Sequence, residues 1–413
     1  MLKGFFLCAF AVLMLCAGCV VTPLKHQPSG VTPVKIGVLV PVSPESSPQM
    51  QRLQTGISFA ADELNSGSGV NGRAVELTCR AAGNSLEKAN RIFAEFDQAG
   101  VAAVILAGSA DEVRMVQPLL RQYRMPGIVV LATADCFSED PELEKWLMRV
   151  TFTDTQQGIV LGAFLKYWRN LERAAVLVEN SAHASYGRTV AKALREQFEK
   201  AGGQIVCSET FDPGKNNDTQ LKNLLQADPE AVFIGAADPE VAANWVKALR
   251  KAGYQGVLAG PDLWEETEFL KNCSAQPGDC IFTSLYAPDE NGENNRNFRQ
   301  AFRTKCFYYP GDYEAQGYDA LKLLCRSIAY SATLEEFQKG LSGLVNYPGA
   351  AARYSCPDGE LQRSVFLKTL RPSGKERGLA VPRHRLTLTP GNLELFKDKP
   401  KKVEEKSIWE EIK

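Results

Sequence analysis

The sequence predicts an α/β protein made of two doubly wound, three-layer lobes, and three observations lead to this class. Short apolar stretches alternate with amphipathic helical stretches, which is the pattern of parallel βαβ units. This alternation restarts after residue 158, as expected for a second lobe. A chain of 413 residues also exceeds the size at which a single core normally keeps growing.

The first unit, residues 34–73, predicts a strand, a loop, a helix and a turn, in that order. Val34–Val40 is mostly apolar, as in strands that are buried on both faces of a parallel sheet. Three prolines within residues 41–48 then impose a loop. The helix after the loop has one apolar face, formed by Leu53, Ile57, Ala60, Ala61 and Leu64. Because ligands bind beyond the carboxyl ends of strands in such sheets, we expect the proline loop to overhang a ligand crevice.

The remaining predicted elements continue the alternation of strands and helices. In the first lobe the predicted strands are Val75–Cys79, Ala102–Leu106 and Ile128–Ala132, with helical faces over residues 86–96 and 113–123. In the second lobe, strands Ala174–Val178, Gln204–Ser208, Ala231–Gly235 and Gly256–Ala259 alternate with helices Thr189–Ala201, Asp218–Gln226 and Glu240–Ala252. Three further helices, near residues 297–305, 315–330 and 334–344, precede a hairpin of residues 352–356 and 364–370 that turns at Pro357-Asp358-Gly359.

Three stretches of the first unit, IGVLVP, GISFAADELN and GVNGR, closely resemble the start of type I periplasmic solute-binding proteins of the leucine/isoleucine/valine-binding family. The resemblance continues to about Arg371. It implies two lobes that close like a hinged trap on a small ligand, with an ABC permease as partner. The hinge is expected where the chain crosses between the lobes, at residues 149–158, 281–288 and 346–350. The expected lobes are residues 34–152 with 284–346, and residues 153–283 with 347–373.

The first residues indicate export. Lys3 precedes an apolar run, Phe5–Leu15, that is too short to span a bilayer but suits a signal peptide, so residues 1–18 are expected to be removed. Cys16–Cys19 resembles a bacterial lipobox, although Cys16 stands where leucine is usual, and implies lipidation of Cys19. An ordinary signal peptide cut at a nearby small residue is the alternative. Multiple acylation would anchor the protein to a membrane, and residues 19–33 would form a flexible tether.

Eight cysteines lie between Cys79 and Cys356, and an exported chain meets an oxidising compartment. Cys273 and Cys280 flank a Pro-Gly turn and form the best candidate disulfide. A zinc site is the competing hypothesis, but the chain has no CxxC and its three histidines are scattered. No metal ligand is therefore predicted.

The charges and motifs exclude several functions. The 47 basic and 48 acidic residues nearly cancel, so there is no basic surface for nucleic acid. Gly67, Gly69 and Gly72 satisfy GxGxxG, but a helix precedes them and a strand follows, the reverse of a dinucleotide site. Walker, GxSxG and HExxH motifs are missing. We expect no catalytic residue, no cofactor and no enzyme.

Two candidate ligand contacts follow strands of the first lobe. Ser109 and Ala110 open the helix after the third strand, where free amides and a hydroxyl can hold a ligand carboxylate. The family often has consecutive hydroxyl residues here, which Ser109 matches and Ala110 does not. Capping of the helix by Ser109 or Asp111 is the alternative. Thr133 ends the fourth strand and resembles the second carboxylate-binding turn of the family.

Two more candidates belong to the second lobe. Tyr186 resembles the position where the family places an aromatic wall, and a core or surface tyrosine is the alternative. Asp262 follows the last strand, where the family often has an acidic residue for the ligand's ammonium group, and helix capping is the alternative. Ala236 and Ala237 stand where several relatives place a ring, which predicts a roomier pocket or one tuned to something else.

These observations predict an exported, membrane-anchored protein that captures a small polar ligand, an amino acid or an amide-like molecule, for an ABC importer. An adapter or sensor with the same fold, such as a regulator of cell-wall synthesis, is the alternative. Residues 374–413 lie beyond the resemblance and are expected to form a solvated or disordered tail. A docking segment with Ile408, Trp409 and Ile412 as its contacts is the alternative for that tail.

Overall fold

The computed structural model describes residues 22–25, 32–181, 184–273, 278–288, 292–357, 360–372 and 380–388. For residues 371–372 and 380–388 only the backbone is described. The predicted signal peptide, the lipidation site Cys19 and residues 389–413 of the predicted tail lie outside these ranges.

The first lobe is built on a five-stranded parallel sheet with the order β2-β1-β3-β4-β5. Its strands are β1 Val34–Val40, β2 Val75–Ala81, β3 Ala103–Leu106, β4 Gly127–Val129 and β5 Leu147–Arg149. Helices α1 Pro48–Ser66, α2 Leu86–Ala99, α3 Ala110–Tyr123 and α4 Pro141–Glu144 connect them, with a 3-10 turn at Pro44–Ser46. The sequence missed β5, and β4 is shorter than the predicted strand, because both have only three residues.

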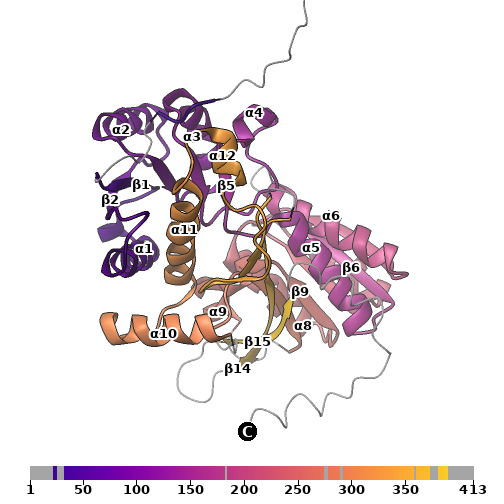
Figure 1. The fold of residues 1–413 in the computed structure, drawn as a ribbon. Coiled ribbons are helices and arrows are strands. Elements are labelled where there is room, and N and C mark those ends of the chain that lie inside the picture. Colours follow the sequence, from indigo (N-terminus) through magenta and orange to yellow (C-terminus); the bar gives the residue numbers. More distant parts are fainter. Residues whose placement is uncertain are drawn as a thin grey trace, which may run out of the picture.

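The chain returns to the first lobe with α10 Glu293–Cys306, α11 Asp312–Ile328 and α12 Leu334–Lys339. Figure 1 shows these orange helices beside the indigo and purple elements of the amino-terminal half. Helix α11 packs along α1, and glycine permits the close approach: a Cβ added to Gly56 would lie 2.1 Å from the carbonyl oxygen of Glu314. Residues far apart in sequence thus share one core.

The second lobe contains a seven-stranded mixed sheet with the order β15-β14-β10-β9-β8-β6-β7. Its strands are β6 Arg173–Glu179, β7 Gln204–Phe211, β8 Ala231–Gly235, β9 Val257–Gly260, β10 Cys280–Ser284, β14 Val365–Pro372 and β15 Ala380–Leu388. Its helices are α5 Asp154–Ala163, a π-helical turn Phe164–Trp168, α6 Ser185–Lys200, α7 Asp218–Ala227, α8 Pro239–Lys251, a 3-10 turn Asp262–Glu265 and α9 Thr267–Asn272.

The side chains of the second sheet alternate between two separate cores, one on each face. Val176, Phe233 and Ala259 lie in the core under α5 and α6. Their neighbours Leu177 and Ile234 lie in the core under α8 and α9. This period of two in buried strands gives the three-layer arrangement that the sequence predicted.

The first arm of the predicted carboxy-terminal hairpin pairs with residues that follow the predicted turn, but the predicted second arm is wrong. Residues Arg353–Ser355 form β12, which pairs with β13 Gln362–Arg363 and with β11 Tyr347–Pro348 in a small sheet of three strands. Residues 365–370 instead pair as β14 with β10, antiparallel. The physical reason is burial: Val365, Phe366 and Leu367 are all buried, and a short hairpin offers no second face to cover them.

Two segments expected to be flexible are ordered. Residues 380–388, within the predicted tail, form β15 against β14. Thr22–Lys25, within the predicted tether, packs on the first lobe, with Leu24 buried. Both segments contain only a few apolar residues among polar ones. The composition of a longer window therefore did not reveal that these short stretches are ordered.

Two of the predicted crossings between the lobes meet at one buried side chain. Arg363 of β13 donates to the carbonyl oxygen of Val150 (2.9 Å) on the first crossing and to that of Leu285 on the second. It also donates to Gln316 Oε1 on α11 at 2.8 Å. Arg363 therefore connects the first two predicted crossings with α11.

In the described part of the chain, no helix is both long and apolar enough to cross a membrane. The same residues contain no group of three or more His, Cys, Asp or Glu side chains placed to hold a metal ion.

Candidate functional site

Thr133 and Asp154 lie together where the first lobe passes into the hinge. The backbone N–H of Asp154 donates to the carbonyl oxygen of Thr133 at 2.8 Å, and the Thr133 side chain hydrogen-bonds the Asp154 carboxylate. Thr153 and Gln156 form a capping box at the start of α5, which places Asp154 in its first turn. The polar end of α5 thus faces the strand end that carries Thr133.

Asp262 and Tyr186 meet on the second lobe. The Tyr186 hydroxyl donates to Asp262 Oδ1, and it accepts from the backbone N–H of Leu263 at 3.4 Å. Gln157 of α5 holds the same turn, because its Oε1 accepts from the backbone N–H of Asp262 (3.1 Å) and from the hydroxyl of Thr283 (2.6 Å). Asp262 is therefore held by Tyr186 of α6 and by Gln157 of α5, at the carboxyl edge of the second sheet.

The Asp154 and Asp262 carboxylates interact electrostatically. Burial raises the pKa of Asp154 to about 7, and the nearby charge of Asp262 adds to the rise. Burial also raises the pKa of Asp262, although the hydrogen bond from the Tyr186 hydroxyl opposes the increase. Two interacting carboxylates in a partly buried environment favour a positively charged ligand, because its charge would stabilise their ionised forms.

Two buried polar atoms in this region have no hydrogen-bond partner in the described structure, namely Asp154 Oδ1 and Gln157 Nε2. Asp154 is 5% exposed and Gln157 is fully buried. Buried polar atoms are normally paired, so an unpaired acceptor and an unpaired donor one turn apart on α5 indicate capacity for a small polar molecule.

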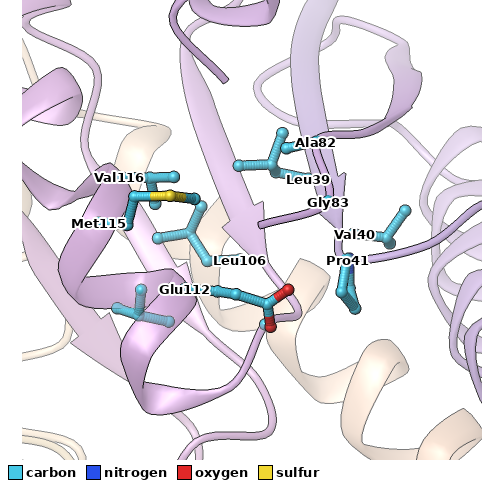
Figure 2. A pocket seen from close by; sticks show the side chains of 11 residues that line it. Leu39, Val40, Pro41, Ala82, Gly83, Leu106, Glu112, Met115 and Val116 are labelled. Atoms are coloured by element: carbon cyan, nitrogen blue, oxygen red, sulfur yellow. The ribbon is translucent and has the colours of Figure 1, made fainter. Parts of the chain in front are cut away.

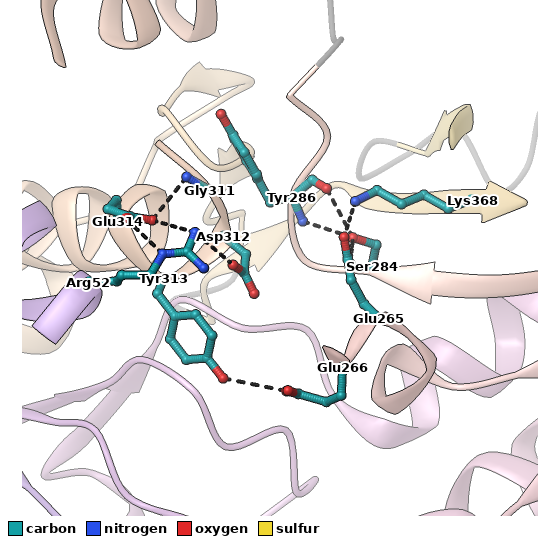
Figure 3. A network of polar contacts seen from close by, with 10 residues as sticks. All are labelled: Arg52, Glu265, Glu266, Ser284, Tyr286, Gly311, Asp312, Tyr313, Glu314 and Lys368. Carbon is teal, nitrogen blue, oxygen red and sulfur yellow. Dashed lines mark hydrogen bonds and ion pairs between the residues drawn. The ribbon is translucent and has the colours of Figure 1, made fainter. Parts of the chain in front are cut away.

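A second polar network spans the boundary between the lobes (Figure 3). On the first lobe, Arg52 donates to both Glu314 oxygens at 2.8 and 2.9 Å. On the second lobe, Glu265 pairs with Lys368 and accepts from the hydroxyl of Ser284. Arg52 also pairs with Asp312 Oδ1 at 3.7 Å, so one guanidinium is shared by two carboxylates of the first lobe.

The Tyr313 hydroxyl joins the lobes by donating to Glu266 Oε1 at 3.4 Å. Burial, and then the charge of Asp312, raise the pKa of Glu266 to about 7. Burial, and then the charge of Glu265, raise the pKa of Asp312 to about 6. Because the charge of Asp262 also acts on Glu266, the four carboxyls Asp154, Asp262, Glu266 and Asp312 form one acidic interlobe cluster.

Ser109 caps α3. Its side chain accepts from the backbone N–H of Glu112, and Glu112 Oε2 in turn accepts from the Ser109 N–H (2.8 Å) and hydroxyl (2.9 Å). The chain's own carboxylate thus occupies the place that the sequence suggested for a ligand carboxylate. Ala110 is the first residue of α3, so a ligand would meet its backbone amide rather than a hydroxyl.

A mostly apolar hollow of about 270 Å³ lies beside this turn (Figure 2). Its walls come from the carboxyl ends of β1, β2 and β3 and from the first turns of α3, with Glu112 as its charged member. Pro41 lines one side of the hollow, whereas the rest of the proline loop, residues 42–48, does not.

The structure thus brings Thr133, Tyr186 and Asp262 to the hinge side of the lobe boundary, around Asp154, whereas Ser109 and Ala110 lie at the neighbouring end of α3. Sequence reasoning missed Asp154 and Gln157. The signal was present in the stretch TDTQQ, where Thr153 and Gln156 have the spacing of a capping box at the end of a strand.

Cys273 and Cys280 are both buried in the same core of the second lobe. Burial raises the pKa of Cys280, and the neighbouring Cys273 adds to the rise, so the two thiols lie within electrostatic reach of each other. Among the described residues no disulfide bond is formed.

Comparison with known proteins agrees with this architecture. A curated amino acid binding protein of Pseudomonas aeruginosa is 25% identical over 230 residues, which cover 53% of this chain and 58% of that relative. The leucine-, isoleucine-, valine-, threonine- and alanine-binding protein of the same organism is 21% identical over 300 residues, covering 71% of this chain and 78% of the relative.

Among solved structures, the substrate-binding protein of a branched-chain amino acid transporter from Streptococcus pneumoniae, in complex with isoleucine, has a similar fold. Its TM-score is 0.66 at 20% identity, and the match covers 86% of this chain and 99% of that one. Residues 33–375 also match the sequence profile of the periplasmic binding proteins. The chain therefore belongs to the periplasmic binding protein family.

Proposed function

We propose that this protein captures a small ligand with a positively charged nitrogen, most simply an amino acid, between its two lobes and presents it to an ABC importer. It does no chemistry. The observation that carries the proposal is the pair of carboxylates Asp154 and Asp262, which approach each other from the hinge and the second lobe beside Thr133. An ammonium group between them would be paired on two sides.

The proposed contacts divide by lobe. Asp262 holds the ammonium group, Tyr186 fixes Asp262 and forms a wall, and the unpaired Gln157 amide donates to an oxygen of the ligand. On the first lobe, Thr133 supplies a hydroxyl and the Ala110 amide a second donor. An aliphatic side chain of the ligand would lie toward the apolar walls of the hollow beside α3. The names of the amino acid-binding relatives support this ligand class.

A thermal-shift screen against free amino acids, diamines and uncharged amides tests the proposal. A ligand at a hundred times its Kd stabilises the folded state by about 2.7 kcal/mol, which a melting curve detects readily. Stabilisation by amino acids but not by the matching uncharged amides is expected. A response confined to uncharged molecules would contradict the role of the two carboxylates.

The second candidate is an adapter or sensor of the same fold, and one observation favours it. The Glu112 carboxylate already accepts the N–H and hydroxyl of Ser109, so the chain itself fills the first-lobe site for a ligand carboxylate. A thermal-shift screen in which no small molecule stabilises the protein, together with retention of a macromolecular partner by the intact protein, would favour this function over transport.

We further propose export and lipidation at Cys19, followed by attachment to a membrane, on the basis of the signal-like residues 1–18. Replacement of Cys19 by alanine is expected to move the protein from the membrane to the soluble fraction. A mature amino terminus elsewhere, without an acyl mass, would reject the anchor.

We also propose that Cys273 and Cys280 become a disulfide after export, since both thiols share one core. Closing this short loop stabilises a fold by roughly 2 to 3 kcal/mol in the chain-entropy model. Non-reducing peptide mapping of protein from the oxidising compartment should find the pair linked. Two free thiols, or a link to another cysteine, would reject it.

The lobe boundaries at residues 152–153, 283–284 and 346–347 likewise remain a proposal. The contacts of Arg363 with Val150 and Leu285 support the first two of them, because the backbone must bend near this side chain when the lobes move.

A further inference from the structure

The amino-terminal segment Thr22–Lys25, here called the strap, lies against one end of the first lobe. Pro23 bridges to Thr333 as an isolated antiparallel pair. Leu24 donates its backbone N–H to the carbonyl oxygen of Ala332 at 3.0 Å. The N–H of Leu334 donates to the Thr22 carbonyl oxygen at 2.9 Å, so the strap is hydrogen-bonded on both sides of the bridge.

Side chains fasten the strap as well. Leu24 is only 3% exposed and belongs to the core of the first lobe. Lys25 Nζ pairs with Asp97 at 2.6 Å near the end of α2. Unseating the strap would expose Leu24 and break these contacts, so its position is part of the folded lobe.

Only two residues separate the strap from Cys19. Three extended residue steps span at most about 11 Å, which limits the distance between the Cα atoms of Cys19 and Thr22. If acyl chains on Cys19 enter a bilayer, the end of the first lobe that carries the strap must lie at the headgroups. A long flexible tether would impose no such constraint.

The surface next to the strap suits that position. Tyr330, in the turn between α11 and α12, is 82% exposed and lies two residues from the strap's partner Ala332. Tyrosine is enriched at membrane–water interfaces, where its ring meets acyl chains and its hydroxyl meets water. Helices α2, α3 and α12 share this end of the lobe, whereas α10 lies at the other end (Figure 1).

We propose that the strap end of the first lobe, from Thr22–Lys25 to Tyr330, is a membrane-apposed surface that rests on the phospholipid bilayer and orients the whole protein. This inference depends on the proposed lipidation of Cys19. It assigns different roles to the lobes, because the strap holds the first lobe at the bilayer and the hinge alone connects the second. Ligand-driven closure would therefore move the second lobe relative to the membrane.

Hydroxyl-radical footprinting tests the orientation on full-length protein isolated with its lipid and reconstituted in vesicles of phosphatidylethanolamine and phosphatidylglycerol. Compared with the soluble Cys19→Ala protein, labelling of Tyr330 is expected to fall severalfold. Phe307, which is 90% exposed at the end of α10, is the internal control and should be labelled equally in both samples.

A variant with a flexible Gly/Ser segment inserted between Val21 and Thr22 provides the matched control. It keeps Cys19 and the strap but removes the distance limit, so protection of Tyr330 should disappear while membrane attachment persists. Protection that the insertion leaves unchanged would overturn the short-tether argument.

The outcomes separate this inference from the anchor on which it rests. An acylated amino-terminal peptide with fully labelled Tyr330 would overturn the membrane-apposed surface and leave lipidation intact. A mature chain without an acyl mass would overturn both. Equal protection of Tyr330 and Phe307 would indicate general shielding by vesicles and would also overturn the specific surface.

Discussion

The hinge is polar and buried and the acidic interlobe cluster is polar and half-buried, and their partners also differ. At the hinge, the Asp319 carboxylate accepts from the backbone N–H groups of Ala350 and Ala351, each at 2.7 Å, and from the Tyr354 hydroxyl at 2.9 Å. Burial raises the pKa of Asp319, and these donors oppose the rise. Arg363 likewise finds acceptors on the first two crossings.

In the acidic interlobe cluster the partners are incomplete. Asp154 Oδ1 has no partner within the described residues, and the pKa of both Asp154 and Glu266 rises to about 7. The Asp319 carboxylate and the Arg363 guanidinium are thus paired inside the chain, whereas the Asp154 carboxyl keeps an oxygen for another partner. Such unpaired, pKa-shifted groups are the usual mark of a functional site.

The largest expected effect comes from breaking the hinge. Arg363→Met leaves the carbonyl oxygens of Val150 and Leu285 buried without their donor, which should lower the free energy of unfolding by about 3 to 5 kcal/mol. Urea denaturation measures the loss. Arg91→Met is the control, because its side chain is 69% exposed and a surface change should have little effect. Equal stability of the two variants would contradict the hinge role.

Changing the site should affect binding rather than folding. Asp262→Asn preserves the shape that meets Tyr186 but removes the charge for an ammonium group, so affinity should fall about 10-fold to 150-fold. Calorimetric titration measures the change, with a melting curve recorded alongside. Exposed Glu268 offers a matched Glu268→Gln control on the neighbouring helix α9. Loss of stability with unchanged affinity would reduce Asp262 to a structural residue.

The raised pKa of Asp154 predicts a pH dependence of stability. An acid whose pKa is higher in the folded state binds its proton more tightly there, so stability is greatest at low pH and falls as pH rises from about 4 to about 7. Asp154→Asn should reduce this fall by an amount on the order of 2 kcal/mol. Urea midpoints at pH 5 and pH 8 test the prediction. Identical pH slopes for variant and wild type would refute it.

The smallest effect separates capping from binding at α3. Ser109→Ala removes the cap of α3 and should cost about 1 kcal/mol of stability while leaving Kd unchanged. Denaturation and titration of the same sample decide the question. A tenfold loss of affinity without loss of stability would place Ser109 in the ligand site after all.

The sequence by itself was sufficient for the fold class and for most strands and helices. Helix α1 could be assigned because its apolar residues follow the helix period, and the buried strands β1 and β8 because they are short, nearly continuous apolar runs. It also indicated Thr133, Tyr186 and Asp262, since βα turns at strand ends lie on one edge of a sheet.

Only the tertiary structure decided which polar groups meet. Asp154 and Asp262 are more than a hundred positions apart, and their mutual pKa effect exists only because α5 and the turn after β9 are folded together. The pairing of β14 with β10, the strap on the first lobe and the contacts of Arg363 are likewise non-local. Local propensity and periodicity describe neighbours along the chain, whereas burial and charge depend on neighbours in space.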